Sequence, residues 1–155
     1  MEYLVLKSLH VLSVVLFLGN IITGVFWKFH GDRVGTLPAR AQALEGVIHS
    51  DRWFTIPGVL AIIITGVWMA LSAHLPLLGT KWIAWSLILF GISGFCFGVF
   101  VGPLQKKLLA NVRGGIAGAW NQAEYQKLSR AWEIWGAVAT LAPVIALFLM
   151  VTKPA

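Results

Sequence analysis

The chain has 155 residues, of which 58% are hydrophobic and only 12% are charged. Soluble domains carry about 25% charged residues, so this composition indicates a membrane protein, and the length suits one domain, residues 1–155. The net charge of +6 does not predict nucleic-acid binding, because the basic residues lie in the gaps between apolar runs rather than on one face. The single cysteine, Cys96, offers no disulfide partner within the chain and no cysteine-based metal site.

Four apolar runs are long enough to cross a bilayer, which takes about 20 residues of helix. They cover residues 4–27, 53–74, 82–103 and 134–152. The first run lacks the basic start and the Ala-x-Ala site of a signal peptide, so we interpret it as a retained span. The third is expected to stop near Pro103. Together the runs predict an all-α fold, an integral membrane four-helix bundle.

Charge predicts how the bundle is oriented. The connections after the first and third runs carry most of the basic residues, whereas the connection after the second offers only Lys81. The positive-inside rule therefore places those two connections in the cytoplasm and both termini outside. Each connection also contains a segment with apolar residues on one face, residues 38–50 and 119–133, so we predict cytoplasmic extensions of helices two and four. A flexible turn is expected at residues 111–118.

Polar and small residues of the first run fall on one stripe of its helix. The stripe contains His10, Ser13, Asn20, Thr23 and Gly24. Because an imidazole or an amide is costly in hydrocarbon, this stripe should face the partner helices. His10, about two turns below the outer surface, is then a candidate axial ligand to haem iron. The alternative is a histidine that is hydrogen-bonded to a neighbouring helix.

Two residues at the outer end of the bundle share the level of His10. His74 lies at the end of the second run, where the helix dipole alone favours a histidine, and a ligand role is the alternative. Lys81 comes just before the third run. It either extends to the lipid headgroups or pairs with a buried anion such as a haem propionate.

Two acidic residues at the inner ends of helices two and four have basic neighbours. Asp51 is followed by Arg52, and Glu133 lies near Arg130. We expect structural ion clusters at these positions.

Glycines mark the expected helix contacts. Gly94 and Gly98 form a GxxxG motif, which permits close approach of two backbones. Packing within the membrane is one interpretation, and room for a flat cofactor between helices is the other. Glycine-lined faces on four short spans are also compatible with a homodimer.

Several motifs resemble an uncharacterised bacterial family of predicted four-helix integral membrane proteins. They are LHVLSVVLFLG in the first run, DRWFTIP and TGVW in the second, and the terminal MVTKP. The resemblance covers nearly the whole chain and implies a location in the bacterial inner membrane. More distantly, the chain is similar to the HemJ protoporphyrinogen oxidases and to the membrane domain of the copper-resistance protein CopD. HemJ proteins have a histidine early in helix one and a lysine at helix three, which His10 and Lys81 match, so the resemblance implies a haem or porphyrin site.

We therefore predict a membrane b-type haem protein with a redox or electron-transfer role. In this hypothesis His10 binds the iron, and Lys81 or His74 supplies a second ligand or a propionate contact. The expected partners are the lipid bilayer, haem or porphyrin, and a quinone or another redox partner, and whether the protein is an enzyme is left open. The alternatives are a HemJ-like protoporphyrinogen oxidase, a copper-handling protein using Met69 and Cys96, and a non-catalytic scaffold subunit. The sequence contains no HExxH or CxxC motif and no phosphate-binding glycine loop, which argues against the corresponding soluble-type chemistry.

Overall fold

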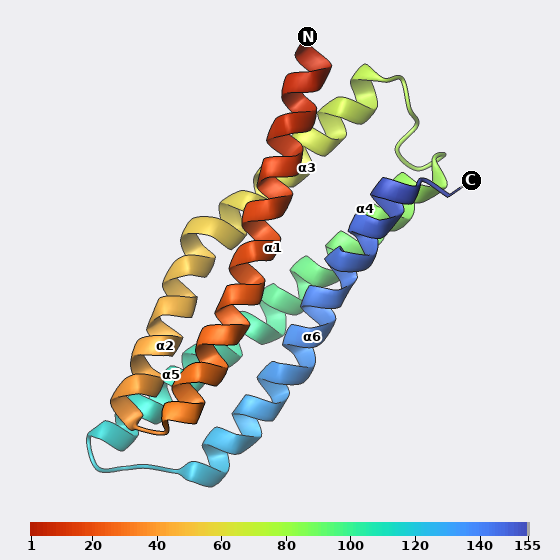
Figure 1. Ribbon diagram of the computed structural model, residues 1–155. Coiled ribbons are helices and arrows are strands. Elements are labelled where there is room, and N and C mark those ends of the chain that lie inside the picture. The colour runs from red at the N-terminus through yellow and green to blue at the C-terminus, as the bar shows by residue number, and fades with distance from the viewer. Residues whose placement is uncertain (155) are drawn as a thin grey trace.

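The structure, a computed structural model that describes residues 1–154, consists of four long helices arranged as two antiparallel hairpins (Figure 1). The first hairpin joins α1 (Glu2–Val34) to one continuous helix made of α2 (Leu37–Ser50), the short π-helix η1 (Asp51–Thr55) and α3 (Ile56–Ser72). The second hairpin joins a continuous helix to α6 (Gln122–Thr152). That helix is made of α4 (Lys81–Cys96), η2 (Phe97–Val101) and α5 (Gly102–Ile116).

The two ends of the bundle differ. Both termini and residues 73–80 lie at one end, which we term the terminal end (Figure 1). The short breaks at residues 35–36 and 117–121 lie at the opposite end, which we term the connection end.

Each of the four long helices is long and apolar enough to cross a membrane. Their outward faces expose many large apolar side chains, among them Leu12, Val15, Ile64 and Phe148. Helices are suited to contact with lipid when their backbone N–H and C=O groups are hydrogen-bonded within the helix and their outer side chains are apolar. The predicted all-α membrane bundle of four helices is therefore confirmed.

A proline follows each π-helix and explains why the helix widens there. Pro57 and Pro103 are the second residues of α3 and α5. A proline has no N–H, and its ring crowds the carbonyl four residues back, so it interrupts the ordinary α-helical ladder. The chain adapts with bonds that span five residues. In η1 the N–H of Ile56 donates to the carbonyl of Asp51, and η2 repeats the pattern.

Two expectations about the third long helix are wrong for this reason. The helix does not stop near Pro103 but continues through the π turn to Ile116. Residues 111–116 of the expected flexible turn are therefore helical, and the helical structure is interrupted only at residues 117–121.

All four helices continue past the expected spans at the connection end. The extensions predicted for helices two and four are present as α2 and the first part of α6, and α1 and α5 extend as well. Deeply buried core side chains lie between these extensions: Leu44, Leu108, Val112, Tyr125 and Trp132.

The two hairpins diverge toward the terminal end (Figure 1). There α1 packs along α3 and α4 packs along α6, whereas α3, throughout its described length, makes no close backbone approach to α4 or α6. Phe17 of α1 and Phe90 of α4 meet across the divergence, with ring centroids 5.5 Å apart. The polar centre of the bundle lies on the connection side of this aromatic contact.

Candidate functional site

Asp51, the first residue of η1, is buried where the two hairpins meet. Three neutral side chains donate hydrogen bonds to its carboxylate. Thr55 Oγ1 and Asn20 Nδ2 lie 2.7 Å and 3.1 Å from Oδ1, and Gln105 Nε2 lies 3.0 Å from Oδ2. Because Asn20 comes from α1 and Gln105 from α5, one carboxylate ties the two hairpins together.

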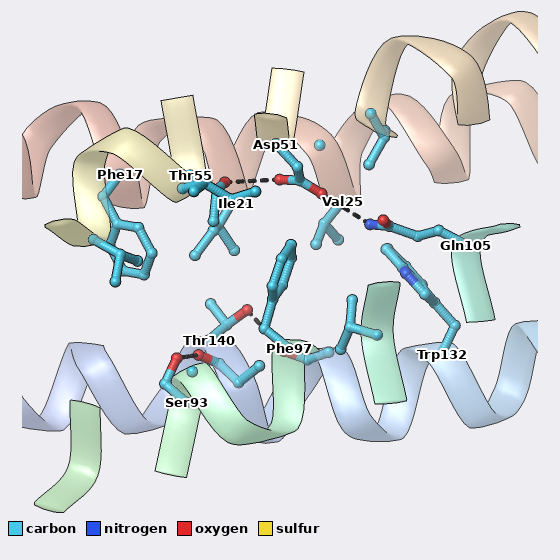
Figure 2. Close-up of a pocket in the computed structure, with 18 of the residues that line it drawn as sticks. Phe17, Ile21, Val25, Asp51, Thr55, Ser93, Phe97, Gln105, Trp132 and Thr140 are labelled. Atoms are coloured by element: carbon cyan, nitrogen blue, oxygen red, sulfur yellow. Dashed lines mark hydrogen bonds between the residues drawn. The ribbon is translucent and has the colours of Figure 1, made fainter. Parts of the chain in front are cut away.

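A cavity of about 190 Å³ lies beside this carboxylate, between the hairpins (Figure 2). Figure 2 shows Phe17 toward one end of the cavity, Trp132 toward the other and Phe97 rising from the wall opposite Asp51. On that opposite wall the hydroxyls of Ser93 and Thr140 donate to backbone carbonyls of α6. Asp51 and its donors are therefore the main polar feature of an otherwise apolar and aromatic space.

The ion pairs expected from neighbouring residues do not form. Arg52 is exposed and does not reach Asp51, because consecutive residues of a helix point about 100° apart. Glu133 pairs with Lys28 of α1, at 3.2 Å, rather than with Arg130. Among residues 1–154 none of the ion pairs includes Asp51, so only neutral donors contact its carboxylate.

Sequence reasoning missed this centre. Asn20 faces inward as predicted, but the sequence predicts an ion cluster for Asp51 and no role for Gln105. The signal that could have found the centre is that three polar residues lie at the connection ends of three different runs. Asn20 is inside the first run, Asp51 comes just before the second and Gln105 just after the third.

A second polar cluster lies nearer the connection end, around Lys28. This side chain is only 2% exposed. Its Nζ lies 2.8 Å from Asp32 and 3.2 Å from Glu133, and it donates to Ser129. It also lies 5.3 Å from the ring centroid of Trp132, whose Nε1 is buried without a hydrogen-bond partner. The lysine and the two carboxylates join α1 to α6 and form a structural cluster.

His10 lies in the seam between α1 and α3, away from the cavity. Its Nδ1 is 2.9 Å from Thr65 Oγ1. The Thr65 hydroxyl donates its own hydrogen to the carbonyl of Ala61, at 2.6 Å. When the Thr65 hydroxyl donates to Ala61, the imidazole Nδ1–H donates to the threonine oxygen, and in that tautomer Nε2 carries the lone pair.

A glycine lets the imidazole lie flat against α3. A Cβ built on Gly66 would come within 3.1 Å of His10 Cε1, closer than an ordinary van der Waals contact. The Thr65-Gly66 pair thus supplies one hydrogen-bond acceptor and one gap for the ring. The alternative given for His10, a hydrogen bond to a neighbouring helix, is present.

The other two predicted site residues lie at the terminal end. His74 lies two residues past the end of α3, in the left-handed backbone conformation (φ 53°), and its side chain is exposed. Lys81 is exposed as the first residue of α4. In the described chain no hydrogen bond or ion pair joins either of them to His10. Their roles as ligand or propionate partner stay predictions.

Residues 1–154 contain no group of three or more His, Cys, Asp or Glu side chains arranged to hold a metal ion. Cys96 is buried in the apolar core. The described residues therefore offer no such cluster for a metal ion that is held by protein ligands alone. A haem iron is a different case, because the porphyrin supplies four nitrogens and one protein ligand can suffice.

Four membrane-length helices around a buried polar centre define a multi-pass integral membrane protein. The chain belongs to the family described as "Predicted integral membrane protein (DUF2269)", whose model matches residues 4–154. No curated protein and no solved structure matches the chain.

Proposed function

We propose that this integral membrane protein binds b-type haem, with His10 as the iron ligand, and has a redox or electron-transfer role. The observation that carries the proposal is the 2.9 Å contact between His10 Nδ1 and Thr65 Oγ1, which fixes the ring through one nitrogen; with the proton on Nδ1, Nε2 is the nitrogen that would bind iron. Histidines that bind metals almost always donate their other ring N–H to a fixed acceptor in this way. The match of His10 and Lys81 to positions in HemJ proteins motivates the same assignment.

The haem would lie beside His10 on α1, on the terminal side of the contact between Phe17 and Phe90 and apart from the Asp51 cavity. Lys81, at the start of α4 on the other hairpin, would pair with a propionate. Bound haem supplies one-electron chemistry at its iron, and the chain's part is to hold the imidazole and exclude water.

The proposal assigns iron binding to His10 alone. His74 lies beyond the end of α3, about 10 Å or more from Thr65 along a helix that rises about 1.5 Å per residue. A contact from His74 to the same iron would need this helix end to rearrange. Oxidation of protoporphyrinogen and copper handling stay predictions.

The test is the haem content of protein purified from cells supplied with haem precursor. We expect about one haem b per chain in the wild type, seen as a Soret band and as a pyridine haemochrome. His10→Ala should lose it. The matched control is His30→Ala, which removes an exposed histidine from the same helix and should keep the haem. A folded wild type without haem, or a His10→Ala variant that retains it, would overturn the proposal.

Thr65→Val provides a second test. It keeps the shape of the side chain and removes the acceptor for His10 Nδ1. Loss of an outer partner of a ligating histidine typically lowers affinity about 10- to 100-fold, and we expect haem to dissociate from Thr65→Val that much more readily. Equal affinity in Thr65→Val and wild type would contradict the role given to this hydrogen bond.

A further inference from the structure

We propose that the cavity beside Asp51 binds a small organic monocation of the quaternary-ammonium class. This proposal goes beyond haem binding and does not depend on it, because the cavity and His10 lie on opposite sides of the contact between Phe17 and Phe90. It is carried by three features: an unpaired buried carboxylate, aromatic walls and a lining that reaches the lipid face.

The Asp51 carboxylate has three neutral hydrogen-bond donors and, within residues 1–154, no cationic side chain paired with it. Thr55, Asn20 and Gln105 all donate to Asp51, and donated hydrogen bonds stabilise the ionised form. A buried carboxylate is ordinarily paired with a cation. Lys28 is buried eight residues after Asn20 on the same helix, but its charge is already paired with Asp32 and Glu133. Within residues 1–154 the positive partner is missing, and the empty space lies beside the carboxylate.

The walls distinguish an organic cation from a metal ion. An alkali or alkaline-earth ion needs several oxygen ligands, but the side chains around Asp51 present N–H and O–H donors. The remaining lining includes Phe17, Phe90, Phe97 and Trp132. Aromatic faces attract alkylated ammonium groups, most strongly away from water. A volume of about 190 Å³ also exceeds what one bare ion fills.

The cavity has a side that faces lipid. Ile56 and Leu60 line it and are 50% and 56% exposed on the surface of α3. A small cation that reaches this surface of α3 can approach the carboxylate from there.

The test uses choline, with 3,3-dimethyl-1-butanol as the neutral molecule of the same shape. Binding of radiolabelled choline to the purified full chain is measured at equilibrium in detergent. We expect one saturable site, at least tenfold weaker binding to Asp51→Asn, and no competition from the neutral analogue. Glu45→Gln, which removes an exposed carboxylate and changes the net charge equally, should bind like the wild type.

A second variant tests the space rather than the charge. Gly136 lines the cavity, and a Cβ added there meets nothing within 4 Å, so Gly136→Leu should fold and fill the space. It should abolish choline binding while leaving Asp51 intact. The proposal is overturned if choline does not bind the wild type, if the neutral analogue or sodium chloride at equal concentration competes equally, or if Gly136→Leu binds normally. Haem content, measured on the same samples, reports separately on His10.

Discussion

At the scale of single residues, buried charges differ in what neutralises them. Lys28 is almost completely buried and lies against Asp32 and Glu133, so its charge is balanced within the protein. Asp51 has hydrogen-bond donors but no cation. A charge that is paired and hydrogen-bonded can be purely structural, whereas a buried carboxylate without a cation gains most from a cationic ligand.

Tyr125 gives a residue-scale prediction about pH. Burial, followed by its hydrogen bond to the Asp32 carboxylate, raises the pKa of Tyr125 above its ordinary value of about 10. Above pH 10 the unfolded chain releases this proton while the folded chain holds it, so the free energy of unfolding should fall by up to about 1.4 kcal/mol per pH unit. Below pH 10 this contribution is fully present.

The measurement is the midpoint of thermal unfolding in detergent between pH 9 and 11. Tyr125→Phe has no proton to release and should lose less stability across this range than the wild type. Parallel curves for the two proteins would contradict the assignment, because other groups that titrate near pH 10 are common to both.

At the scale of elements, two glycines on different helices have opposite surroundings. Gly66 of α3 lies against the His10 ring, whereas a Cβ added to Gly98 in η2 meets nothing within 4 Å. The GxxxG motif of Gly94 and Gly98 therefore does not mark a contact within this chain. The glycines of α3 that face α1, Gly58 and Gly66, mark the closer seam.

This difference predicts unequal effects of the same substitution. Gly66→Leu overpacks the seam and should destabilise the protein by about 1–3 kcal/mol, with loss of bound haem because the imidazole is displaced. Gly98→Leu should change stability by no more than about 0.5 kcal/mol. Unfolding in detergent measures both. Equal losses would show that the seam is not specifically packed.

The four helices could be predicted from the sequence, but the continuation of the third one through Pro103 could not. Runs of apolar residues have the length that a bilayer requires, and residues 38–50 show a one-faced pattern, so spans and extensions follow directly. A proline such as Pro103 ordinarily ends a helix. Here a π turn absorbs it, and whether a chain bends, breaks or widens at a proline depends on the packing around it.

At the scale of the whole molecule, the candidate site could be predicted only in part. The inward face of α1 was expected, and His10 and Asn20 both make contacts with the second long helix. What brings Gln105 to Asp51 is the packing of one hairpin against the other. That pairing joins residues 54 positions apart and leaves no local pattern in the sequence.

The orientation of the bundle is a further prediction at this scale. The basic connections predict that the terminal end faces outward. In a Cys96→Ala background, Leu78→Cys places an exposed thiol at the terminal end and Lys107→Cys places one in the α5 extension. A maleimide that cannot cross membranes should label position 78 and not position 107 in intact cells. The reverse pattern would invert the topology.

The central claim, that the His10 imidazole is an iron ligand, is tested most directly by replacing the ring and then returning it. His10→Gly leaves a space that free imidazole can enter. We expect His10→Gly to lose the haem Soret band when supplied with haem, and added imidazole to restore haem binding and the wild-type oxidised and reduced spectra. A His10→Gly protein that keeps the wild-type spectrum without imidazole would contradict the account.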